Sequence, residues 1–190
     1  VLGDVLGSMP SVDADSIPWQ IKFLENPSSK FALPGAITLA RHDAIHVLLG
    51  RGLRAQDEAF VIGFTMGATK VLRRWQEVLF AVATKYFYPK PYNFTDDDIN
   101  ALKLGFGAGA ASKAVRLERF PFEDHLDKTV DEMRAMVGIS LPELHAYYRK
   151  EALLTPDSKE TRRLDKDVDG VDPSSIQRPE APDSDWQREK

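Results

Sequence analysis

The chain has 190 residues, of which 43% are apolar, and a formal net charge of −4. This length and apolar content suit one globular domain with a substantial core. The mild negative charge argues against a nucleic-acid partner, because nucleic-acid-binding domains usually present a basic face. The absence of cysteine excludes disulfides, thiolate metal ligands and a cysteine nucleophile.

No run of about 18 uninterrupted apolar residues occurs, so we expect no transmembrane helix. The N-terminal residues also lack a basic segment followed by an apolar run, so we expect no secretory signal. We therefore expect a cytoplasmic protein, or one peripherally associated with the cytoplasmic face of a membrane.

The first half of the chain predicts an N-terminal arm over residues 1–12 and three helices. The first helix covers about 13–26 and is entered through Ser16. The second covers about 35–49, is apolar on nearly every side and is stopped by Gly50 and Gly52. The third covers 55–88, with a kink expected near Gly67.

The second half predicts three more helices and a tail. Thr95 is placed to cap a helix that continues to about Arg119, with three aspartates in its first turn. Two amphipathic helices follow over 124–138 and 141–154. Residues 155–190 are polar and proline-rich and read as a tail. We therefore predict an all-α protein with one helical domain of about six to seven helices over 13–154 and an extended polar C-terminal tail.

Two short motifs are set aside. "GFGAGA" (105–110) fits a loose dinucleotide-binding pattern, but it lies inside a predicted helix, whereas that pattern requires a preceding strand. "DKDVDGVD" (165–172) resembles the start of a calcium-binding loop, but Ile176 stands where the loop needs a bidentate glutamate.

A cluster of polar residues interrupts the apolar helix over 35–49. His42, Asp43 and His46 fall within an arc of about 100° on this helix, and an antiparallel hairpin through Gly50 and Gly52 brings Glu58 opposite His46. Two buried imidazoles and a carboxylate are costly without a partner, and a divalent cation would remove that cost. The mixed ligand set favours Zn²⁺, with Mg²⁺ as an alternative. A hydrogen-bonded polar cluster in the core remains the competing interpretation.

The same residues carry a family resemblance. His42-Asp43-Ala44-Ile45-His46, eleven further residues and Glu58 match the H-D-x-x-H-x11-E signature of the coenzyme Q biosynthesis protein 4 family. The segments "HDAIHVLLG", "RLERF" and "DEMRAMVGI" also resemble segments of that family, so that the resemblance covers about residues 30–150. The chain departs from the family pattern at "GAGAASKAV", where the family is more basic, and in its C-terminal tail.

The resemblance implies an all-helical protein that binds a divalent ion and a prenylated lipid. Proteins of that family serve ubiquinone synthesis at a membrane surface, where they organise other enzymes of the pathway and remove the ring carboxylate of a prenylated benzoate intermediate. Carried over to this chain, the resemblance makes His42, Asp43, His46 and Glu58 the metal ligands. The metal would then stabilise negative charge that develops on the ring.

An apolar slot for the lipid is predicted between helices. Aromatic side chains would form one wall of the slot, and the small face of the helix after Thr95 would form the other. The lipid-binding residues predicted in this way are Phe60, Phe64, Trp75, Gly105, Phe106 and Gly109. Ordinary core packing of the same residues is the alternative.

Three functions compete at this point. The first is a metal-dependent lyase that decarboxylates a prenylated hydroxybenzoate. The second is a noncatalytic scaffold that binds prenyl lipid and other quinone-biosynthesis enzymes. The third is a metal-dependent phosphohydrolase, which would need more basic residues than Arg41 near the site. A homodimer is also expected, from the polar tail and the glycine-faced helix.

Overall fold

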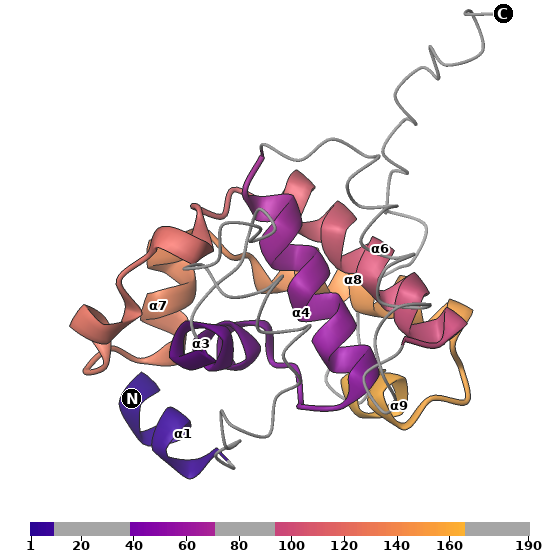
Figure 1. The fold of residues 1–190 in the computed structure, drawn as a ribbon, viewed down its shortest axis with the longest axis horizontal. Helices are drawn as coiled ribbons and strands as arrows, with labels where there is room; N and C mark the ends of the chain where they lie inside the picture. The colour runs from indigo at the N-terminus through magenta and orange to yellow at the C-terminus, as the bar shows by residue number, and fades with distance from the viewer. Residues whose placement is uncertain (10–38, 71–93, 166–190) are drawn as a thin grey trace, which may run out of the picture.

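The structure is a computed structural model that describes residues 1–9, 39–70 and 94–165. Within these ranges the chain forms helices and turns without a strand, which confirms the all-α prediction (Figure 1). The predicted helix over 13–26 and the part of the predicted 55–88 helix beyond residue 70 lie outside the described residues. In chain order the described helices are α1 (Leu2–Ser8), α3 (Leu39–Leu49), α4 (Ala55–Ala68), α6 (Asp96–Ala111), η2 (Leu117–Arg119), η3 (Phe122–His125), α7 (Val130–Val137), α8 (Leu141–Leu154) and α9 (Lys159–Asp165).

The core is built on α4 and α6, which pack against each other along their lengths (Figure 1). Gly105 lies against the backbone of Phe60, and one turn later Gly109 lies against the backbone of Phe64. Contacts that advance in the same direction on both helices show that α4 and α6 run parallel. Gly63 and Gly67 of α4 make the reciprocal contacts with α6, so each helix contributes a pair of glycines four residues apart, which allows backbones to approach closely.

Several predicted helix ends are confirmed by local hydrogen bonds. The Thr95 hydroxyl accepts a hydrogen bond from the Asp98 amide, and the Asp98 carboxylate accepts one from the Thr95 amide. Gly50 and Gly138 follow α3 and α7 with positive φ values of 66° and 76°, the left-handed geometry common after a helix end. Helix α8 has the predicted bounds and is capped by Ser140.

The helix after Thr95 is shorter than predicted. It ends at Ala111 and not near Arg119, because the Ser112 hydroxyl donates to the Gly109 carbonyl at 2.8 Å and accepts from the Ala114 amide at 3.2 Å. These local bonds replace the next helical turn.

Helix α4, which contains Phe60, ends at Ala68, close to the kink predicted near Gly67. Lys70 then adopts a left-handed conformation with φ of 56°. The Lys70 ammonium then donates to the Ala110 and Ser112 carbonyls at the end of α6.

Both ends of the described chain are more structured than predicted. Residues 2–8 of the predicted arm form α1, whose Leu2 is fully buried and whose Leu2 and Gly3 amides donate to the Lys128 and Leu126 carbonyls. The predicted tail begins with α9, which buries Thr161 and Leu164. In both segments one or two buried residues suffice to dock a short helix, a signal too sparse for periodicity to detect. Residues 166–190 lie outside the described residues.

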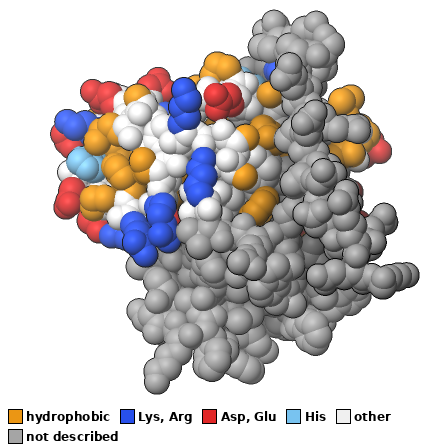
Figure 2. Space-filling view, turned by 90° about the horizontal axis from the view of Figure 1, so that it is seen from above, with side chains coloured by type: hydrophobic (Ala, Val, Ile, Leu, Met, Phe, Trp, Pro, Cys, Tyr) orange, Lys and Arg blue, Asp and Glu red, His pale blue; other side chains and the backbone are white. Residues whose placement is uncertain are grey.

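On the described part of the face in Figure 2, basic, acidic and apolar side chains are interspersed. None of the described helices is long and apolar enough to cross a membrane. The glycine face that motivated the homodimer prediction packs within the chain, so the dimer stays a prediction that rests on the tail.

Candidate metal centre

His42 and His46 lie one turn apart on α3, as their spacing predicts. Their ring centroids are 4.6 Å apart and the rings are nearly perpendicular, at 82°. His46 is fully buried, whereas 19% of the His42 side chain is exposed. The pair therefore has one imidazole in the core and one at the edge of the site.

Glu58 reaches both imidazoles from the first turn of α4. Its Oε2 lies 3.4 Å from the Nε2 of His42 and 3.4 Å from the Nε2 of His46. The three side chains each offer a ligand atom, and these atoms lie within 4.8 Å of one another. A group that can hold a metal ion is therefore present.

The turn between α3 and α4 makes this approach possible, but not through the predicted antiparallel hairpin. Helix α4 runs away from α3 after the turn, and the two helices make few contacts (Figure 1). Glu58 meets the histidines because it lies so near the turn.

The two ring nitrogens of His46 have different environments. Nδ1 lies 2.7 Å from the Gly52 carbonyl oxygen, which can only accept a hydrogen bond, so Nδ1 carries the proton. The other nitrogen, Nε2, is buried and has no hydrogen-bond partner. If Nε2 carries no proton, its lone pair faces the Glu58 carboxylate and two acceptors meet without a donor between them.

A divalent cation fits this arrangement. Imidazole nitrogens and one carboxylate form a ligand set found in catalytic zinc sites. Two ligands of one tetrahedral zinc ion, each about 2.0–2.2 Å from it, are about 3.4 Å apart. Both His–Glu pairs show this separation, at 3.4 Å. The Nδ1–H bond to a carbonyl is also the usual outer contact of a metal-binding histidine.

The protonation states also suit metal binding. Burial lowers the pKa of His42 to about 4, with His46 adding repulsion and Glu58 opposing the shift. Burial acts to raise the pKa of Glu58, but the contact with His46 and the attraction of both imidazoles outweigh burial and lower it. At neutral pH, His42 is thus neutral and Glu58 is ionised, as metal ligands must be.

Asp43 does not belong to this group of three, so its place in the predicted four-ligand set stays a prediction. One residue after His42 corresponds to a rotation of about 100° around the helix, so the two side chains point in different directions. Burial raises the pKa of Asp43, Glu58 adds to this effect, and His46 opposes it. Asp43 thus influences the site electrostatically without contributing one of the three clustered ligand atoms.

A buried ionic network behind the site was missed by sequence analysis. Arg51 is ion-paired with both carboxylate oxygens of Glu151 at 2.8 Å and lies 3.1 Å from Asp57. Its guanidinium also stacks on the rings of Phe60 and Tyr148. The sequence signal was two charged residues, Asp57 and Glu151, on otherwise buried helix faces, but nothing in the spacing shows which cation they meet.

The predicted lipid-binding residues do not form one slot. Phe60 and Phe64 are core residues with at most 1% exposure. A Cβ on Gly105 or Gly109 would lie 2.9 Å from the carbonyl carbon of Phe60 or Phe64 and would overlap the carbonyl oxygen, so α4 fills the space proposed for the lipid. Phe106 is partly buried against the same core, and Trp75 lies outside the described residues. For the described members, core packing is the better interpretation.

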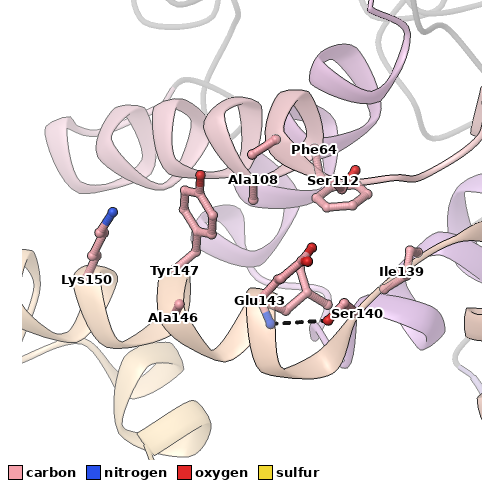
Figure 3. A pocket seen from close by; sticks show the side chains of 11 residues that line it. Phe64, Ala108, Ser112, Ile139, Ser140, Glu143, Ala146, Tyr147 and Lys150 are labelled. Carbon is pink, nitrogen blue, oxygen red and sulfur yellow. Dashed lines mark hydrogen bonds between the residues drawn. The ribbon is translucent and has the colours of Figure 1, made fainter. Parts of the chain in front are cut away.

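A pocket of about 500 Å³ lies outside the predicted slot, between the end of α6 and the start of α8 (Figure 3). Phe64 and Ala108 form part of an apolar wall, and Tyr147 projects from α8 toward α6. Glu143 and Lys150 add opposite charges on the α8 side. Of the predicted lipid-binding residues, Phe64 lines this pocket.

Comparisons with the models of known protein families, with curated proteins and with solved structures found no significant match. The geometry of the site is therefore the evidence from which its function is inferred.

Proposed function

We propose that the protein binds one divalent cation through His42, His46 and Glu58, with Zn²⁺ as the preferred ion and Mg²⁺ as the alternative. The observation that carries the proposal is the buried Nε2 of His46, which lacks a hydrogen bond and lies 3.4 Å from the Glu58 carboxylate. A proton between the two groups is the competing explanation. The separation of 3.4 Å is longer than a good hydrogen bond and suits two ligands of one ion.

The proposed site is suited to chemistry as well as to stability. Three protein ligands leave a coordination position for an outside molecule, as in catalytic zinc sites. Glu58 and His42 keep 30% and 19% of their side chains exposed, so the site has an accessible side. A bound ion would supply a Lewis acid that polarises an oxygen of the ligand.

The substrate class that we propose is a prenylated hydroxybenzoate, whose ring carboxylate would be removed. The support is the H-D-x-x-H-x11-E motif and its resemblance to the coenzyme Q biosynthesis protein 4 family, together with the meeting of three of the motif's four side chains. The pocket beside Phe64 is a candidate place for part of the apolar chain. On this proposal the protein works at a membrane surface, as a homodimer and alongside other enzymes of quinone synthesis.

A noncatalytic scaffold that binds the same lipid is the second candidate. It is favoured by the position of the pocket, because none of His42, His46 and Glu58 is among the residues that line it.

One experiment separates the two candidates. The zinc-loaded protein is incubated with a ring-carboxylate-labelled prenylated hydroxybenzoate, and released carbon dioxide is measured beside a His46→Ala control. Release that depends on His46 supports the lyase. Retention of the lipid without release of carbon dioxide supports the scaffold. If the protein neither releases carbon dioxide nor retains the lipid, a prenylated benzoate is not its ligand and both candidates fail.

A further inference from the structure

The Gly52 carbonyl decides which nitrogen of His46 carries the proton, so the position of the turn over residues 50–54 matters to the site. This turn is short, and its Gly52 is only partly buried. Backbone bonds hold its start, where the Arg51 amide donates to the His46 carbonyl at 3.0 Å. The Gly52 residue itself is packed against charged side chains.

Arg51 anchors the turn from inside. Its side chain is fully buried, and its charge is balanced by Glu151 of α8 and Asp57 of α4. The guanidinium lies 4.5 Å from the ring centre of Phe60. A guanidinium with two carboxylates and an aromatic face has little freedom to move, so the residue before Gly52 is fixed.

Arg163 of α9 closes the turn from outside. Its Nη2 lies 2.8 Å from Oδ1 of Asp57, which also faces Arg51. A Cβ added to Gly52 would lie 2.8 Å from the other Asp57 oxygen and would overlap the Arg163 guanidinium. The Gly52 peptide therefore lies directly against the Arg163–Asp57 pair.

Helix α9 is held in this position by polar contacts with the start of α4. The Gln56 side-chain amide donates to the hydroxyls of Thr155 and Thr161, both at 3.2 Å. The Ser158 hydroxyl donates to the Gln56 oxygen at 2.6 Å. Because Gln56, Asp57 and Glu58 are consecutive, the same turn of α4 carries the α9 contacts and the metal ligand.

We propose that Arg163 and Asp57 are positioning residues for the metal centre. They hold the Gly52 carbonyl against Nδ1 of His46, which keeps the Nε2 lone pair directed at Glu58 and ready for the ion. This inference rests on the proposed function, and it gives the C-terminal helix α9 a role in metal affinity although α9 contributes no ligand.

The test compares three variants of the full chain. Arg163→Gln removes the ion pair with Asp57, and Arg163→Lys keeps the charge. Arg162→Gln is the matched control, because Arg162 pairs with exposed Asp157 and is not in contact with Gly52. Zinc affinity is measured by competition with a chelator, and the tautomer of His46 in the metal-free protein is measured by ¹⁵N NMR of the ring nitrogens.

We expect Arg163→Gln to weaken zinc binding by about 10- to 100-fold, the usual effect of losing an outer-shell partner. The ring of His46 should then populate both neutral tautomers. Arg163→Lys should keep at least part of the wild-type zinc affinity and of the wild-type tautomer preference. Arg162→Gln should match the wild type. A purely structural role for α9 would lower the melting temperature without changing the tautomer.

The inference is overturned if Arg163→Gln keeps the wild-type affinity and the wild-type tautomer. If the wild type binds no zinc, the proposed function fails, and the tautomer alone then decides whether Arg163 positions His46. If Arg163→Gln does not fold, Gly52→Ala disturbs the same contact from the other side without a substitution in α9, and it should give the same losses.

Discussion

The two ring nitrogens of His46 have different roles. Its Nδ1 is fixed by the Gly52 carbonyl, and its Nε2 is left for the cation that we propose. The spacing of four residues between His42 and His46 was enough to predict their contact, because it follows from the helical repeat. The bond to Gly52 was not predictable, because it depends on the path of an irregular turn.

At the residue scale, Glu58 and Asp43 should differ in their effect on metal binding. Glu58→Gln removes a charged ligand without changing shape, so zinc affinity should fall by more than about 100-fold, beyond the usual outer-shell effect. Asp43→Asn should cost less than about 10-fold, because Asp43 is not among the clustered ligand atoms. Isothermal titration with zinc measures both. Equal losses would mean that Asp43 turns inward as a fourth ligand when the ion binds.

The lowered pKa of His42 makes the metal-free protein sensitive to acid. Above pH 6.5, His42 is neutral in both the folded and the unfolded protein and does not make stability depend on pH. Between about pH 6.5 and 4, the His42 side chain binds a proton in the unfolded chain but not in the folded one. The free energy of unfolding should therefore decrease by about 3 kcal/mol as pH falls through this window.

Urea denaturation of the wild type and of His42→Gln at several pH values measures how much of this decrease in the free energy of unfolding is due to His42. Acid should destabilise the variant less than the wild type over this range. Parallel pH profiles for the two proteins would contradict the lowered pKa.

At the element scale, the parallel pair of α4 and α6 depends on glycines whose missing side chains let the backbones meet. The sequence shows the repeat of Gly105 and Gly109, but the partner could equally have been a lipid or a second chain. The matching repeat of Gly63 and Gly67 was the signal that identifies α4 as the partner, because two such repeats commonly pack against each other.

Gly105→Ala should therefore destabilise the protein. The new methyl group would press against the Phe60 backbone, which cannot move aside, and overpacking of this kind costs about 1–3 kcal/mol. Gly107→Ala on the same helix is the matched control. There the methyl would lie 3.4 Å from the Tyr147 ring, an ordinary contact, and the gain in helix propensity should stabilise by about 0.5–1 kcal/mol. Thermal unfolding measures both, and similar effects from the two changes would rule out the close packing.

The elements that sequence predicted well are those with strong local signals. Helix α8 has a serine cap, and α7 ends at the predicted glycine, Gly138. The start of α7 was wrong, because the helix begins at Val130 after the Thr129 cap and not at residue 124. Helices α1 and α9 were missed because each is seven residues long and docks through very few buried side chains. The end of α6 was missed because a serine hydroxyl, and not a proline or glycine, terminates it.

At the scale of the whole molecule, the proposed metal centre and its surroundings join parts of the chain that are far apart in sequence. Helices α3 and α4 carry the three proposed ligands, α8 carries Glu151, and α9 carries Arg163. An ion bound only by the folded chain stabilises all of these elements together. With the proposed ion bound, the polar cluster would stabilise the core.

Added zinc should therefore raise the melting temperature of the metal-free wild type. At a free zinc concentration 100 times the dissociation constant, binding contributes about 2.7 kcal/mol, which corresponds to about 5–10 °C for a chain of this size. Differential scanning calorimetry with and without a chelator measures the shift. A stabilisation that persists in His46→Ala would place the bound zinc outside this centre.

The most direct measurement is the amount of metal that the full chain retains. The chain is stripped with a chelator, reloaded with excess zinc, passed over a desalting column and analysed for metal, beside His46→Ala treated in the same way. The account predicts one ion per wild-type chain and almost none in the variant. A wild type that retains no ion, or a variant that retains as much as the wild type, would contradict it and leave His42, His46 and Glu58 as a polar cluster of the core.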